Sequence, residues 1–154
     1  MNARERTMPK WVKLGAVFVL LAHGLIHLIG TVVYLRLGEV QGFAYKTTLL
    51  NGSWDLGASG MGVFGALWAV AALGFIVAAL TLLTNRRVWR PILAAVAVFS
   101  LVLTGLDSSL AFAGVVLNLV ILALVFWSWR SSAQNSFEAK KKEIHAQRND
   151  RYRS

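Results

Sequence analysis

Four long apolar blocks dominate this chain, at residues 12–35, 58–83, 91–106 and 110–129. A helix needs about 20 predominantly apolar residues to cross the roughly 30 Å hydrocarbon layer of a bilayer. A soluble domain of 154 residues could not bury all four blocks. Charged residues make up only 15% of the chain, against about 25% in typical soluble domains. We therefore predict an all-α integral membrane protein, an antiparallel bundle of four transmembrane helices.

Charge alternates between the two sides of this predicted bundle. Basic residues are in excess before residue 14, between residues 84 and 90, and after residue 129, whereas the stretch 36–58 is neutral. Lys and Arg are enriched in cytoplasmic loops, so both termini are expected in the cytoplasm. Residues 1–130 then form a four-span membrane domain with an external loop at 37–57. Residues 131–154 form a basic cytoplasmic tail, expected to be disordered or loosely helical.

The net charge of +9 could also suggest nucleic-acid binding. Such binding needs a continuous basic surface, and the apolar blocks interrupt this one, so no nucleic-acid partner is expected. The expected partners are the lipid bilayer and either further copies of the chain or a larger membrane complex. The chain has no cysteine, which excludes disulfides and thiolate metal sites. The first block exceeds the roughly 7–15 apolar residues of a secretory signal, so it is expected to be a retained span.

The segment "LAHGLIHLIG" places His23 and His27 one turn apart on one helix face. Counting about 1.5 Å per residue from the outer end of the span places His27 in the outer leaflet, at the same depth as a layer of polar residues from other spans. His23 lies deeper, and no partner can be named for it. The other members of the layer are predicted to be Asn118, Ser100 and Thr104, with Asp107 and Tyr34 above it.

Several interpretations of this layer stay open. A neutral histidine could hydrogen-bond to a neighbouring helix and fix the packing. The histidine pair could chelate a metal, since i and i+4 histidines do so in helical zinc motifs. One histidine could ligate haem, or the layer could hold a lipid or a quinone-like head group. Asp107 lies before the fourth block, where its simpler role is the N-cap of that helix. The cofactor is therefore left unknown.

No catalytic motif is recognised, so an enzyme is not favoured, although catalysis stays open. The small residues Ala58, Gly62 and Ala66 recur every fourth position, a spacing that lets helices approach closely in lipid. We assign them to packing within the bundle, with a homodimer face as the alternative. The predicted function is an intramembrane polar layer around His27 that binds a small ligand or locks the bundle. The alternative is a non-catalytic accessory subunit of a larger membrane complex.

The first block resembles a family of small four-helix bacterial membrane proteins whose first helix reads L-H-G-L-I-H-L-x-G. The resemblance extends over about residues 14–126, and departs from the family pattern at "TVVYLRLGEV" and "GLDSS". A looser likeness, in size and number of spans, is to DoxX-like membrane proteins. The resemblance implies a multi-pass protein of the bacterial inner membrane, and no particular reaction. The matching positions are His23, Gly24, His27, Gly30, Ser100, Asp107, Gly114 and Asn118.

Overall fold

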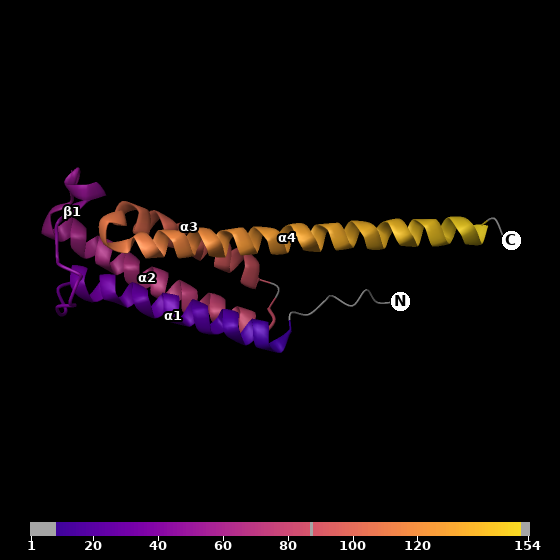
Figure 1. Cartoon of the computed structure of the whole chain (residues 1–154), viewed down its shortest axis with the longest axis horizontal. Coiled ribbons are helices and arrows are strands. Elements are labelled where there is room, and N and C mark those ends of the chain that lie inside the picture. The colour runs from indigo at the N-terminus through magenta and orange to yellow at the C-terminus, as the bar shows by residue number, and fades with distance from the viewer. Residues whose placement is uncertain (1–8, 87, 152–154) are drawn as a thin grey trace.

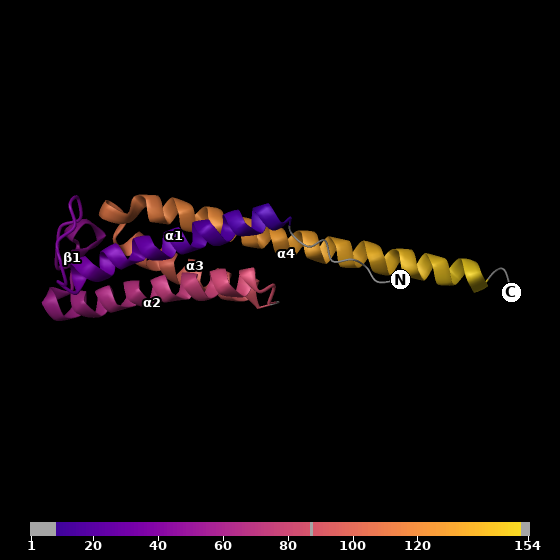
Figure 2. The same cartoon turned by 90° about the horizontal axis from the view of Figure 1, so that it is seen from below.

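The computed structural model describes residues 9–86 and 88–151, which form four α-helices (Figure 1). The helices are α1 (Lys10–Tyr34), α2 (Gly57–Leu83), α3 (Trp89–Leu106) and α4 (Ser108–Arg151). All four are long and apolar enough to cross a membrane. The start of α1 and the α2–α3 connection lie at one end of the bundle, and the α1–α2 loop lies at the other (Figures 1 and 2). The fold is thus the four-span, all-α architecture that the apolar blocks predict.

The fourth helix is longer than the span predicted at residues 110–129, because it continues to Arg151. The backbone departs from helical geometry only in the first turn, at Ala111 (φ −112°, ψ 23°). After Gly114 the sequence contains neither Gly nor Pro, and the tail is rich in Ala, Glu, Gln and Lys. These residues are good helix formers, so residues 131–151 are helical although they lack an extensive apolar stripe.

A small antiparallel hairpin lies in the loop between α1 and α2. It pairs β1 (Thr48–Leu49) with β2 (Trp54–Asp55), in the register Thr48 to Asp55 and Leu49 to Trp54. The short 3-10 turn η1 (Leu50–Gly52) connects them, with Asn51 at φ 58°. The Gly57 N–H donates to Asp55 Oδ1 at 2.9 Å. This bond, followed by one from Thr47, lowers the pKa of Asp55 and fixes the entry into α2.

The apolar core of the bundle has two parts. One lies toward the start of α1 and includes Leu20, Phe75 and Val125, and the other lies toward the hairpin and includes Phe64 and Trp68. Buried polar side chains of α1, α3 and α4 occur in the sequence between the residues of these two clusters. The helices pack in the order α1 on α2, α2 on α3 and α3 on α4. A polar layer therefore divides the core and can connect α1 to the α3–α4 pair.

Glycines set the close packing of α1 against α2. A Cβ added at Gly24 would lie 3.1 Å from the Ala72 carbonyl oxygen, and one at Gly65 would lie 2.9 Å from Tyr34 Cβ. A Cβ at Gly30 would lie 2.5 Å from the Trp68 ring. Small residues at a helix interface let backbones approach in lipid, and here they lie on both helices.

The predicted packing positions Ala58, Gly62 and Ala66 are not among these contacts. Ala58 and Ala66 are exposed, and no described atom beyond the neighbouring turns of its own helix backbone lies within 4 Å of a Cβ built at Gly62. The assignment of this ridge to packing within the bundle is therefore wrong. The spacing identified a face of small residues on α2, but spacing alone cannot say which face turns inward.

Replacing Gly30 with alanine is expected to destabilise the bundle by about 1–3 kcal/mol, because the added methyl group overlaps the buried Trp68 ring. Gly62→Ala is the matched control, since it adds the same methyl group to open space and improves helix propensity. Thermal unfolding of both variants in detergent measures the difference. Equal stability of Gly30→Ala and the wild type would show that α1 and α2 do not meet at this position.

Candidate functional site

Four polar side chains from three helices meet inside the bundle. His23 and His27 belong to α1, Ser100 to α3 and Asn118 to α4. Their exposed fractions are 2%, 1%, 0% and 0%, respectively. Polar groups buried in a membrane protein are costly unless they are paired, so the arrangement of their hydrogen bonds decides what these four residues can do. We call them the polar ring.

The direction of each hydrogen bond in the polar ring follows from one fixed acceptor. His27 Nδ1 lies 2.9 Å from the His23 carbonyl oxygen, which can only accept, so Nδ1 carries the proton. In a neutral imidazole the other nitrogen is then an acceptor. His27 Nε2 therefore accepts from the Ser100 hydroxyl at 2.6 Å.

The same reasoning continues through the other two members. Since the Ser100 hydroxyl proton is used on His27, its oxygen accepts from Asn118 Nδ2 at 2.8 Å. Asn118 Oδ1 is an acceptor, so His23 Nε2, at 3.2 Å, donates to it. The path runs from His23 through Asn118, Ser100 and His27 back to the His23 carbonyl, and it is closed. The two histidines are thereby assigned opposite tautomers.

Two details of this layer differ from the sequence-based prediction. His23, for which no partner could be named, donates to Asn118, and His27 reaches Asn118 only through Ser100. Thr104 lies at the edge of the ring, where its hydroxyl bonds to the Ser100 carbonyl at 2.9 Å and lies 3.4 Å from Asn118 Nδ2. The depth count found the members of the layer, but not how they pair.

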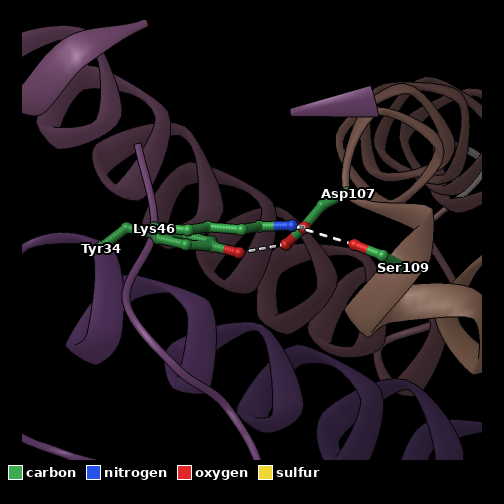
Figure 3. A network of polar contacts seen from close by, with 4 residues as sticks. All are labelled: Tyr34, Lys46, Asp107 and Ser109. Atoms are coloured by element: carbon green, nitrogen blue, oxygen red, sulfur yellow. Dashed lines mark hydrogen bonds and ion pairs between the residues drawn. The ribbon is translucent and has the colours of Figure 1, made fainter. Parts of the chain in front are cut away.

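A second polar cluster lies toward the hairpin end of the bundle (Figure 3). Asp107 is fully buried at the α3–α4 turn, and its Oδ1 lies 2.5 Å from Lys46 Nζ. The Tyr34 hydroxyl, at the end of α1, donates to the other carboxylate oxygen. Lys46 also donates to Ser109 Oγ at 3.0 Å. This ion-pair cluster ties the α1–α2 loop and the end of α1 to the α3–α4 turn.

Asp107 does not act as the predicted side-chain cap of α4. Among the described residues, its carboxylate contacts Tyr34 and Lys46, and it is the Asp107 carbonyl that accepts the first backbone bonds of the helix, from Leu110 and Ala111. Sequence reasoning missed Lys46 as a site residue. Two features of the sequence indicate a possible ion pair: Lys46 is the sole basic residue in 37–57, and Asp107 is an isolated carboxylate beside apolar spans.

One buried donor beside the polar ring lacks a partner within the described part of the chain, the Trp68 indole Nε1. Trp68 is 3% exposed, and its ring centroid lies 5.2 Å from that of His27 and 6.2 Å from that of Tyr34. A buried Trp N–H usually finds an acceptor. This donor is therefore where a carbonyl oxygen or an ordered water could be bound.

The polar ring leaves neither histidine Nε2 atom free for a metal ion. Both Nε2 atoms already bond to Asn118 and Ser100, and a metal ion held by both histidines would displace these bonds. Across residues 9–86 and 88–151, no three His, Cys, Asp or Glu side chains are grouped as metal ligands. What the arrangement does supply is a neutral, directional set of hydrogen bonds across three helices.

No protein-family model, curated protein or solved structure matches this chain. The class of protein is therefore defined by the fold and the buried residues alone. The chain is a multi-pass membrane protein with four transmembrane-like helices and two buried, hydrogen-bonded histidines.

Proposed function

We propose that the protein resides in a bacterial inner membrane with the start of α1, the α2–α3 connection and the end of α4 in the cytoplasm. The support is the match between charge and geometry. The described basic residues at the start of α1, at the α2–α3 connection and after Trp129 of α4 belong to this end of the bundle, where Lys13 Nζ lies 3.2 Å from Asn85 Oδ1, and Lys and Arg favour the cytoplasmic side. The hairpin and the ion-pair cluster then face the periplasm.

Reporter fusions test this orientation. A periplasm-active phosphatase fused after Arg130 is expected to be silent, whereas the same reporter inserted after Gly52, in the hairpin turn, is expected to be active. A cytoplasm-active reporter at the same two positions should give the reverse pattern. Strong phosphatase activity after Arg130 would overturn the proposed orientation and leave the fold untouched.

We infer that the protein is a non-catalytic membrane subunit whose polar ring locks its helices together. The observation that carries this inference is the closure of the ring, in which the hydrogen bonds run from His23 Nε2 through Asn118, Ser100 and His27 back to the His23 carbonyl. Every link of this path joins a donor to an acceptor, and such a network favours one fixed packing arrangement. The lock holds α4 in a defined direction, as an anchor for a larger membrane complex requires.

His27→Ala is expected to lower the melting temperature more than His23→Ala does. Each histidine makes one hydrogen bond between helices, His27 to Ser100 and His23 to Asn118, and such bonds in membranes contribute about 0.6–2 kcal/mol each. The His27 imidazole makes an additional bond within α1, from Nδ1 to the His23 carbonyl. Thermal unfolding of the two variants in the same detergent measures the difference. Wild-type melting of both variants would contradict the lock.

A second candidate function, the binding of a quinone-like or lipid carbonyl, is favoured by the Trp68 N–H beside the ring, which has no hydrogen-bond partner among the residues that the structure describes. Under this alternative, Trp68→Phe removes the donor, although it also removes part of a buried ring and lowers the melting temperature. The variant would lose a small molecule that copurifies with the wild type, whereas Phe64→Leu, which shrinks a neighbouring buried ring and removes no donor, would keep it. Mass spectrometry of organic extracts of these proteins separates this function from the lock, which predicts equal extracts.

A further inference from the structure

The C-terminal part of α4 extends well past the other helices (Figures 1 and 2). From Arg130 to Arg151 it continues for about 32 Å at 1.5 Å per residue as uninterrupted helix. The apolar block of α4 ends at Trp129, so Arg130 marks the proposed membrane boundary. Spanning the bilayer does not require this extension, and neither the polar ring nor the ion-pair cluster includes any of it.

Two large apolar side chains are exposed on the extension. Phe137 is 68% exposed and Ile144 is 55% exposed. Seven residues advance a helix by about 700°, so these two side chains point within about 20° of each other and are about 10 Å apart along the axis. Scattered exposed apolar residues are ordinary in lipid, but this aligned pair lies beyond the membrane boundary, where exposure to water is costly.

Cations surround this apolar pair on the same face. At 100° per residue, four exposed basic residues lie within about 60° of the direction of Phe137. The acidic Glu138 points about 100° away from it. The docking stripe is this apolar pair with the four cations, which are Arg130, Lys140, Lys141 and Arg148.

The stripe is poorly suited to the two simplest occupants. Lys140 lies about 15 Å beyond Arg130, whereas electrostatic attraction to lipid head groups decays over about 8 Å at physiological salt. A second copy of the chain would place the same cations opposite one another, and like charges across an interface are strongly unfavourable. Both arguments point to a partner of opposite charge.

We propose that the docking stripe binds an acidic groove on a cytoplasmic protein, which the membrane bundle thereby anchors. The groove has two apolar pockets about 10 Å apart for Phe137 and Ile144, with carboxylates on both sides for Lys140 and Lys141. This is the helix-in-groove mode of recognition, in which aligned apolar side chains anchor a helix. The proposal rests on the anchor function and on the proposed orientation, and it names the chemistry of the partner.

The test is photo-cross-linking of the full-length protein in its native host cells, with p-benzoylphenylalanine at position 137, 144 or 139. Position 139 points about 200° from position 137 and is the matched control. The expected result is one acidic protein adduct, the same from positions 137 and 144, with at least about tenfold less from position 139. Equal adducts from all three positions, or no protein adduct, would overturn the proposal.

Charge reversal adds a second control within the same experiment. Lys141→Glu lies on the stripe and Lys142→Glu points about 140° from Phe137, although both change the net charge equally. Lys141→Glu should reduce the adduct about tenfold, because it places a carboxylate against an acidic groove, and Lys142→Glu should change it less than about twofold. Equal losses would overturn the proposal.

Other adducts identify other occupants. Cross-links to phosphatidylglycerol, or to a second copy of this chain, as the main product would also overturn it. Lys141→Glu should leave the melting temperature and the fusion reporters unchanged. Failure of the docking proposal can therefore be distinguished from failure of the lock or of the orientation.

Discussion

Lys46→Met is expected to lower the free energy of unfolding by about 3 kcal/mol, because it leaves the Asp107 carboxylate buried without its cation. Asp107 is 0% exposed, and among the described side chains it would keep Tyr34 as its one partner. The methionine side chain fills nearly the same volume as the lysine stem, so most of the lost free energy of unfolding is due to the missing charge. Unfolding by dodecyl sulfate in mixed micelles measures it.

Two further variants separate the ion pair from a general effect of removing a lysine. Lys10→Met, at an exposed position at the start of α1, should change stability by less than about 0.5 kcal/mol. The double variant Lys46→Met with Asp107→Asn should recover much of the loss, because removing both charges of a buried pair is often close to neutral. A double variant as unstable as Lys46→Met alone would show that the lysine acts through packing and not through Asp107.

Asn118→Leu is expected to destabilise the bundle by about 2–4 kcal/mol, since it removes both the acceptor of His23 and the donor to Ser100. It opens the polar ring at the helix that carries the long extension. The remaining buried N–H of His23 is then left in hydrocarbon surroundings, where unpaired polar groups are costly.

Ser128→Ala is the matched control for Asn118→Leu. Ser128 also lies on α4, but its hydroxyl bonds to the carbonyl of Val125 in the same helix, at 2.7 Å. Removal of this hydroxyl should lower the free energy of unfolding by less than about 0.5 kcal/mol, because no contact between helices is removed. If the two variants unfolded at the same dodecyl sulfate fraction, the ring would contribute nothing to the association of the helices.

Most of the fold could be predicted from the sequence, because the length of an apolar block determines whether it can span a bilayer. The first three helices begin and end within two residues of the predicted spans, and the fourth begins within two residues of its predicted start. The helical extension of α4 was not predicted as such. Helix propensity alone is a weak guide without an apolar stripe, and residues 131–151 offer just two large apolar residues, Phe137 and Ile144.

The candidate site could be predicted in part. Depth along each span brought His27, Ser100 and Asn118 to one level, since a helix has a fixed rise per residue. That count does not include the rotation of each helix about its axis. The prediction therefore named no partner for His23, and it wrongly placed the Ala58–Ala66 ridge inside the bundle. Lys46 was missed because its contact with Asp107 depends on the path of a loop, which local sequence does not determine.

The tautomers of the two histidines test the polar ring most directly. Nitrogen NMR of the ¹⁵N-histidine-labelled protein in bilayers reports which ring nitrogen carries the proton, and His145→Gln removes the signal of the third histidine. The account predicts a proton on Nε2 of His23 and on Nδ1 of His27, with both rings neutral. Two histidines with the same tautomer, or with nitrogens shifted by a bound metal, would contradict it.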